Sequence, residues 1–256
     1  MKRYILFVII SLNCLSIYAQ QRNSHNLFWV RLTLADTLNS RLKWEVFLQK
    51  RTQNNYQGDP NVFHSNQFKS YWLWFHYSVN NKLKLSASPF GYFESYTLNN
   101  SNADADIPPI KEFRWAGRIE HETNGKYFNY SNRYNLEYRR RDLKNNDVYL
   151  PNWRIRYMVR LDKPIKNILS PTKTLIFTAY NEVFIQFGKA VRDNPNVFDQ
   201  NRIYLGASYE LIKNIKLNLG YIYGFQERNS GKEFDNINTY WAVLTLDNFI
   251  SQLKKK

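Results

Sequence analysis

The side chains best suited to chemistry in this sequence are a histidine and a serine in the segment FHYS. His76 and Ser78 are two positions apart, so in an extended strand both side chains project from the same face. An imidazole beside a hydroxyl is the arrangement in which a general base activates a serine nucleophile. Tyr77 and Val79 occupy the other face, and residues 80–81 (Asn-Asn) read as a tight turn. The pair therefore lies at the end of a predicted strand, next to a short turn.

Metal and thiol chemistry have weaker support. The other histidines, at positions 25, 64 and 121, have no acidic neighbours at the spacing of a metal site. The segment NNSNADAD at 99–106 lacks the glycine and the terminal glutamate of a calcium-binding loop, so we interpret it as a solvated loop. Cys14 is the only cysteine and lies in the N-terminal leader described next, which excludes disulfides and thiolate chemistry from the mature chain. We expect no cofactor and no metal.

Residues 1–19 read as a secretory signal peptide. Lys2 and Arg3 precede a mostly apolar stretch from 4 to 17, and Ala19 supplies a small residue at a cleavage site. An uncleaved anchor and a lipoprotein signal at Cys14 are the alternatives, but the stretch is short for a span, and Asn13 stands where a lipoprotein signal needs a small residue. We predict one exported domain over residues 20–256.

Apolar and polar residues alternate along long segments of this domain. In the segment 202–211, Ile203, Leu205 and Leu211 fall on one face, and a second run over 215–226 follows after a short turn. Strict alternation indicates β-strands with one apolar face, and runs of ten or more residues are longer than the strands of most soluble sheets. Similar runs predict strands at 26–34, 41–50, 67–79, 82–96, 110–122, 126–140, 148–161, 172–187, 198–211, 214–227 and 235–249.

The connections between these runs alternate between short turns and longer polar loops, the longer ones at 51–66, 97–109, 188–197 and 228–234. This alternation is typical of a transmembrane β-barrel with short periplasmic turns. The fold class predicted is therefore all-β: a single antiparallel transmembrane β-barrel. Because bacterial barrels usually have an even strand number, we expect about twelve strands, with a missed one within 51–66, or ten if the first segment is outside the wall. The tail after Phe249 (ISQLKKK) is expected to be a frayed periplasmic end.

Composition agrees with export to an outer membrane. Aromatic residues are 17% of the chain while the mean hydropathy is −0.58, a combination that excludes helical membrane spans and suits a barrel with aromatic girdles. The formal charge is +15. In this compartment we expect the partners to be outer-membrane lipid, lipopolysaccharide and the barrel assembly machinery rather than nucleic acid. The predicted location is the outer membrane of a Gram-negative bacterium.

Several segments resemble a known family. YNEVFIQF at 180–187, FDQNRIYLGASYEL at 198–211 and NIKLNLGYIYGFQ at 214–226 resemble the family called domain of unknown function 2490. NRYNLEYRRR followed by NWRIRYMVRL resembles it as well. The resemblance covers most of the mature chain and is strongest from about residue 110 onward. The family is similar to outer-membrane barrels of the Bacteroidota, so the resemblance implies a fold and a location but no reaction and no site residues.

The inward face of the predicted barrel is rich in charge. We expect a lumen network made of Glu112, Arg114, Arg118, Glu120, Arg133, Glu137, Arg139, Arg154, Arg156, Glu182, Arg202 and Glu210, with a bulge turning Glu182 inward. A small barrel commonly fills its interior with paired polar side chains, and we favour this interpretation over a basic path for an anionic solute.

The function expected is a structural or small-solute channel role, without enzymatic activity. The alternative is a lipid hydrolase. Lipid A deacylases and phospholipase A of outer membranes use a His-x-Ser pair, and the resemblance of FHYS is to that pair alone.

Overall fold

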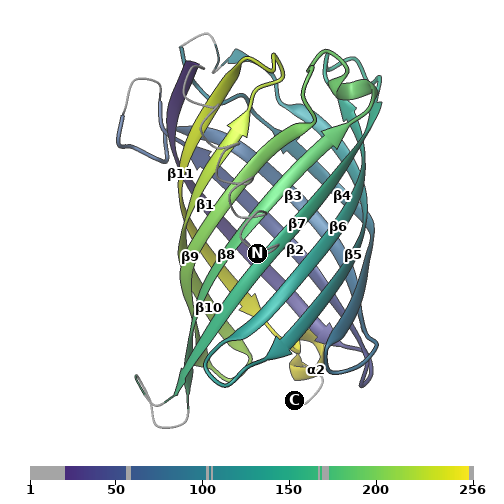
Figure 1. Ribbon diagram of the computed structural model, residues 1–256, viewed down its shortest axis with the longest axis vertical. Coiled ribbons are helices and arrows are strands. Elements are labelled where there is room, and N and C mark those ends of the chain that lie inside the picture. The colour runs from purple at the N-terminus through teal and green to yellow at the C-terminus, as the bar shows by residue number, and fades with distance from the viewer. Residues whose placement is uncertain are drawn as a thin grey trace, which may run out of the picture.

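The computed structural model describes residues 21–55, 59–101, 104, 106–166, 168 and 173–253, and these residues form one closed barrel (Figure 1). The predicted signal peptide, residues 1–19, lies outside the described residues. The eleven strands are β1 (Gln21–Thr37), β2 (Leu42–Gln53), β3 (Ser65–Ser78), β4 (Leu83–Ser95), β5 (Ile110–Asn124), β6 (Asn129–Asp142), β7 (Leu150–Lys166), β8 (Thr174–Phe187), β9 (Phe198–Ile212), β10 (Ile215–Glu227) and β11 (Glu233–Leu246).

The described strands number eleven, so our expectation of twelve, or alternatively ten, is wrong. Neighbouring strands are antiparallel except β1 and β11, which pair in parallel from Gln21↔Glu233 to Leu34↔Leu246. Strand direction alternates around an antiparallel ring, so an odd number of strands leaves one parallel pair. The first segment is therefore part of the wall. The described residues of the segment 51–66 contain no additional strand, because β2 extends to Gln53 and β3 begins at Ser65.

The two ends of the barrel differ. Short connections such as 38–41, 79–82 and 213–214 lie at the lower end in Figure 1, while the longer loops lie at the upper end. A 3₁₀ turn, η3 (Lys189–Val191), belongs to one upper loop. The short helix α2 (Phe249–Leu253) lies at the lower end.

Residues 249–253 are not frayed as expected, because Ser251 donates from its backbone N and its Oγ to the Asp36 carboxylate, at 2.7 Å each. This contact ties α2 to the end of β1. No described helix is long and apolar enough to cross a membrane.

Side chains alternate between the outside and the inside of the wall, as the pleat of a strand requires. The outward set includes many large apolar side chains that are exposed: Val30, Tyr71, Phe75, Leu85, Trp115, Ile119, Leu136, Ile155, Phe177, Ile203, Leu205, Leu219, Tyr221, Tyr240 and Leu244. The inward set is mostly polar or charged and buried. Many of the large apolar side chains of the strands thus lie on the outside of the barrel.

An apolar cluster fills the inner face of β1, β9, β10 and β11. Tyr204 is 1% exposed and its ring lies along the wall over Gly206 and Gly220. A Cβ atom at Gly206 would come within 2.0 Å of the Tyr204 hydroxyl, and one at Gly220 within 2.3 Å of the ring. The two glycines are register partners on β9 and β10, so together they leave room for the ring. Tyr180 stacks on Tyr204 with ring centroids 4.7 Å apart. Charged side chains occupy much of the remaining inner face.

Candidate functional site

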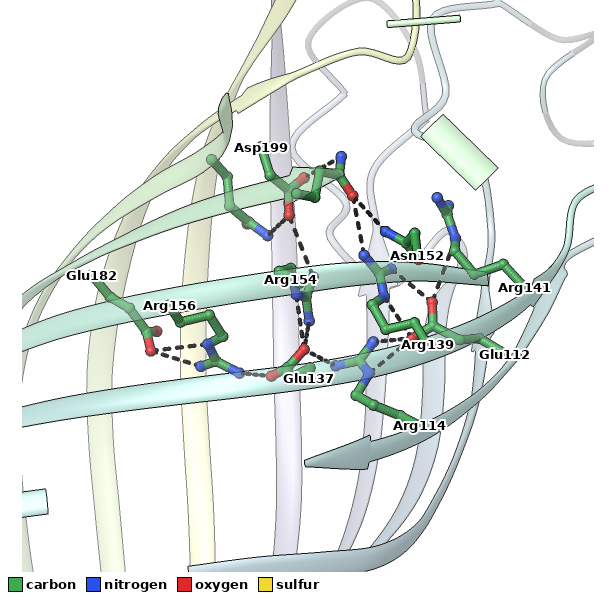
Figure 2. A network of polar contacts seen from close by, with 12 residues as sticks. Glu112, Arg114, Glu137, Arg139, Arg141, Asn152, Arg154, Arg156, Glu182 and Asp199 are labelled. Carbon is green, nitrogen blue, oxygen red and sulfur yellow. Dashed lines mark hydrogen bonds and ion pairs between the residues drawn. The ribbon is translucent and has the colours of Figure 1, made fainter. Parts of the chain in front are cut away.

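One cluster of charged side chains surrounds Glu112, which is 1% exposed (Figure 2). Arg139 donates from Nε at 2.8 Å and from Nη2 at 2.6 Å, one bond to each carboxylate oxygen. Arg114 donates from Nε at 2.8 Å, and Arg141 lies 3.5 Å away. Glu112 therefore has three guanidinium neighbours, and the bidentate pairing with Arg139 fixes the geometry of both groups.

A second buried carboxylate, Glu137, is fully enclosed and also contacts three arginines. Arg154 donates from Nε at 2.8 Å, Arg156 donates from Nη1 at 2.7 Å, and Nη1 of Arg114 lies 3.3 Å away. Arg156 continues to Glu182 at 2.7 Å. Because Arg114 contacts both carboxylates, the two clusters form a single network that runs from strand to strand along the inner face of the wall (Figure 2).

The strand register explains why these groups meet. Glu137 on β6 is the direct register partner of Arg154 on β7, and Arg114 on β5 is the partner of Arg139 on β6. Directly paired residues of an antiparallel ladder have their side chains on the same face, about 5 Å apart at Cβ. Polar groups complete the network, because Gln186 accepts from Arg139 at 3.1 Å and donates to Asp199 at 3.2 Å.

The remaining residues of the expected lumen network lie at its margins or outside it. Arg133 donates to Glu182 at 3.0 Å, and Glu120 pairs with Lys84 rather than with an arginine. Arg118 donates to Asn135 at 3.0 Å and its guanidinium lies 4.1 Å from the Trp74 ring.

Glu210 is not brought into the network. It accepts from the backbone N of Asn214 at 2.9 Å and so stabilises the β9–β10 turn. Glu182 needs no bulge to face inward, because regular alternation buries it while Asn181 is exposed, and the register shift on β8 lies at 184–185.

Five arginines that line the interior cavity were not among the expected lumen residues: Arg31, Arg51, Arg141, Arg160 and Arg228. Alternation along the strands could have found all but Arg228, which follows the end of β10. Arg31 follows Trp29 by two positions on β1, and Arg51 follows Gln49 by two on β2, beyond the point at which the predicted strand ends. Each lies on the inner face and lines the cavity described next.

A cavity of about 840 Å³ extends through the interior and is lined by residues near both ends, from Lys43 and Ser78 at the lower end to Thr97 and Asn229 at the upper. Fifteen arginine and lysine side chains line it, against six aspartate and glutamate side chains. When the buried Glu112 and Glu137 are added to the acidic side chains, the cationic side chains still outnumber them. The lining thus carries an excess of formal positive charge.

The FHYS pair is arranged differently from the prediction. His76 faces the cavity, but its Nδ1 lies 2.8 Å from Oγ of Ser86 on the neighbouring strand, and no described contact joins it to Ser78. On its other side, Nε2 lies 3.1 Å from the carboxylate of Glu45. A serine, an imidazole and a carboxylate therefore lie in line across β4, β3 and β2. Within the described part of the chain, no three His, Cys, Asp or Glu side chains are grouped so as to hold a metal ion.

A charged cluster at the lower rim lies beyond the strand ends. Asp247 follows β11 and accepts from Lys43 at 3.0 Å and from Lys216 at 2.8 Å. Burial raises the pKa of the Asp247 carboxyl, but the two lysines outweigh burial and hold this pKa below its ordinary value. The cluster joins β2, β10 and the end of β11.

These features define a closed β-barrel with an apolar exterior and an arginine-rich interior. The chain matches the model of the family described as "Protein of unknown function (DUF2490)" over residues 26–235, and it belongs to that family. No curated protein matches it.

Two solved structures are similar in fold. A bacterial polysaccharide outer membrane secretin aligns at a TM-score of 0.46 with 9% identity, over 79% of this chain and 63% of that chain. The beta domain of the Bordetella autotransporter Brka aligns at a TM-score of 0.47 with 14% identity, over 79% of this chain and 82% of that chain. This chain thus spans less than two thirds of the secretin chain.

Proposed function

We propose that this protein is an outer-membrane β-barrel of a Gram-negative bacterium whose interior admits small anionic solutes. The exterior supports the membrane part of the proposal. Large apolar side chains such as Leu136, Ile155 and Leu219 are exposed there, and a contiguous apolar surface of this kind marks contact with lipid or with another protein. Strands of 12 to 17 residues are long enough for a tilted crossing of the hydrocarbon layer.

The observation that carries the anion part is the cationic cavity. A lumen that served only as a packed core would pair each arginine with a carboxylate, as Glu112 and Glu137 do on β5 to β8. Instead, four arginines of the lining have no carboxylate within ion-pairing distance among the described residues: Arg31, Arg51, Arg118 and Arg202. Rings of arginine and lysine are the usual basis of anion selectivity in pores.

The expected partners follow from this location. Lipid and lipopolysaccharide would contact the exterior, and the barrel assembly machinery would insert the chain. The outward tyrosines support the lipid contact, since Tyr221 and Tyr240 combine an apolar ring with a polar hydroxyl, as interface residues do.

The test is the conductance of the refolded mature protein in planar bilayers. Under a potassium chloride gradient, we expect a reversal potential of the sign that chloride selectivity produces. The selectivity should weaken as the salt concentration rises, because screening reduces the field of the arginines. Bilayers that contain the folded protein but show no conductance, or a conductance selective for potassium, would refute the proposal.

A second candidate function, ester hydrolysis inside the lumen, is supported by the Ser86–His76–Glu45 alignment. In such a reaction Ser86 Oγ attacks the ester carbonyl and its proton passes to Nδ1 of His76, while Glu45 stabilises the imidazolium at Nε2. The imidazolium then protonates the departing alcohol, and water hydrolyses the acyl-serine. Arg118 is the register partner of Ser86 and supplies positive charge beside it.

The test of this candidate is covalent labelling with a fluorophosphonate, together with fatty acid release from phospholipid and lipopolysaccharide. Labelling that is lost in Ser86→Ala and kept in Ser78→Ala would support a hydrolase. A wild-type protein that is neither labelled nor active would remove this candidate and leave the channel role.

A further inference from the structure

Arg51 differs from the arginines of the buried network because aromatic rings surround it where the others have carboxylates. Its guanidinium carbon lies 3.7 Å from the centroid of the Trp29 ring and 4.0 Å from that of Phe68. Its Nε is buried and has no hydrogen-bond partner. Among the described residues, no carboxylate oxygen lies within ion-pairing distance of Arg51.

The register of three strands produces this arrangement. Trp29 on β1, Arg51 on β2 and Phe68 on β3 are direct cross-strand partners on the inner face. Aromatic rings attract a cation through their electron-rich faces, so they hold the side chain in place. They do not neutralise it, however, and its N–H groups remain available at the cavity, which Arg51 lines.

Two more arginines of the inner face have no acidic partner within ion-pairing distance among the described residues: Arg202, which contacts the Trp29 ring, and Arg31, which lies two positions from Trp29 on β1. The Arg31 guanidinium carbon lies over the Phe47 and Trp241 rings, at 4.8 Å and 5.0 Å from their centroids. Arg202 lies 5.1 Å from the Trp29 ring and donates from Nε to Gln200 at 3.0 Å. Arg31 donates to Gln49 at 3.0 Å and keeps an unpaired, buried Nε.

Trp29 itself has an unpaired, buried indole N–H. The site therefore offers many donors, and each acceptor joined to one of its arginines is an uncharged glutamine.

Electrostatics decides what such a site can bind. Arg51 and Arg202 lie against the same Trp29 ring, so their like charges are close together, and Glu182 on β8, the register partner of Arg202, is already paired with Arg133 and Arg156. Like charges in a partly desolvated interior repel one another, and the repulsion is relieved when a counter-charge enters. A single negative charge cannot offset several guanidinium groups. A small oxyanion with two or more charges can, and its oxygen atoms match the forked donors of arginine.

We propose that Arg51 and Arg202, which both contact the Trp29 ring, form with Arg31 a binding site for a small oxyanion that carries at least two negative charges, such as a phosphate or sulfate group. This inference rests on the proposed function, since it names the class of anion that the interior takes. It also separates the interior arginines by role. Those held by Glu112, Glu137 and Glu182 brace the wall, and those held by aromatic rings bind the solute.

The experiment is isothermal titration of the refolded full-length mature barrel in zwitterionic micelles at low salt. Inorganic pyrophosphate, inorganic phosphate, sulfate and acetate are each added, with chloride as the background anion. We expect saturable binding near one site per barrel for pyrophosphate, weaker binding of phosphate and sulfate, and none for acetate. Quenching or enhancement of tryptophan fluorescence should follow the same curve, because Trp29 is in the site.

The variants locate the site. Arg51→Gln should weaken pyrophosphate binding about tenfold or more, the equivalent of one charge-assisted hydrogen bond, and Arg202→Gln should do the same. Arg51→Lys keeps the positive charge but loses the paired N–H donors of the guanidinium, so it should weaken binding less than Arg51→Gln does. The matched control is Arg160→Gln, which removes one charge from the cavity lining where Arg160 pairs with Asp162. It should bind as the wild type does.

The outcomes are separable. Absence of saturable pyrophosphate binding by a folded wild-type barrel overturns the inference, even if the bilayers show chloride selectivity. Equal losses in Arg51→Gln and Arg160→Gln also overturn it, because bulk lumen charge would then explain the binding. Binding that depends on Arg51 in a barrel that does not conduct supports the site and refutes the channel. Retained heat-modifiable mobility in gel electrophoresis confirms that each variant is folded.

Discussion

Leu219 and Asn218 are adjacent on β10 and face opposite sides of the wall, so they offer a direct test of the membrane assignment. Leu219 is 54% exposed on the exterior. Asn218 lines the cavity and accepts a hydrogen bond from Tyr204 Oη at 2.7 Å. We predict that Leu219→Arg impairs folding in lipid far more than Asn218→Arg.

The expected magnitudes follow from these surroundings. Leu219 is the fifth residue of the 13-residue strand, two positions from its middle, and an outward arginine costs about 2–4 kcal/mol at the bilayer midplane. That free energy lowers the folding equilibrium constant by roughly 30- to 700-fold. Asn218→Arg loses one hydrogen bond, at about 1 kcal/mol. The difference between the two variants should therefore be about 1–3 kcal/mol.

The assay is a urea titration of the refolded barrel in phospholipid vesicles, monitored by tryptophan fluorescence and gel mobility. Leu219→Ala is the matched control, because it removes contacts at the same position without adding a charge. If both arginine variants lose the same free energy of folding, the assigned faces or the membrane itself are wrong. A larger loss for Asn218→Arg would point to the same conclusion.

Three further predictions test other parts of the molecule. The exported protein should begin near Gln20 after cleavage at Ala19, and recovery of that mature chain in the soluble periplasm rather than in outer membranes would contradict the barrel's location. Glu137→Gln should lower the free energy of unfolding by about 3–5 kcal/mol, because three arginines lose a buried counter-charge; the exposed Glu122→Gln should change it little, and equal effects would show that the network is solvated. Because the folded pKa of Asp247 is lowered, its contribution to stability is present above the unfolded pKa of about 3.9 and is lost as the pH falls through the folded pKa. Asp247→Asn should therefore flatten the pH dependence of unfolding below about pH 4, and an unchanged pH profile would exclude that contribution.

The faces of the strands could be read from the sequence because alternation is a local property of the pleated backbone. Ile222 is an instructive case. It falls among the polar positions of β10 by spacing, and the structure buries it inside at 1% exposure. The eleven alternating runs correspond to the eleven strands, and the expectation of twelve came from the rule of even strand numbers rather than from the pattern. The strand ends and the closure of the barrel could not be read in the same way. Closure depends on the parallel pairing of β1 with β11, which joins segments about two hundred residues apart and leaves no mark on either pattern.

The partners of the site residues were also beyond the sequence. His76 and Ser78 are close in sequence, but alternate residues of one strand are about 7 Å apart. The cross-strand partner Ser86 is nearer, at about 5 Å between Cβ atoms, and takes the hydrogen bond. The ladder also brings together groups that lie two strands apart, because Arg133 on β6 and Glu182 on β8 are both register partners of Met158 on β7. Such pairs depend on the strand register rather than on spacing in the sequence.

Arg51 on β2 and the arginines around Glu137 on β6 are held in place by different means, and the difference bears on function. An arginine paired with Glu137 is positioned and neutralised, whereas Arg51 is positioned by the Trp29 and Phe68 rings and keeps its charge. A methionine at position 51 would fill the same space without a desolvated charge, and replacing buried charge by apolar groups is often neutral or stabilising. We therefore expect Arg51→Met to leave the barrel as stable as the wild type or more so, while abolishing pyrophosphate binding. A variant that gains or keeps stability and loses binding shows that Arg51 acts in anion binding. A variant that unfolds shows that Arg51 stabilises the barrel instead.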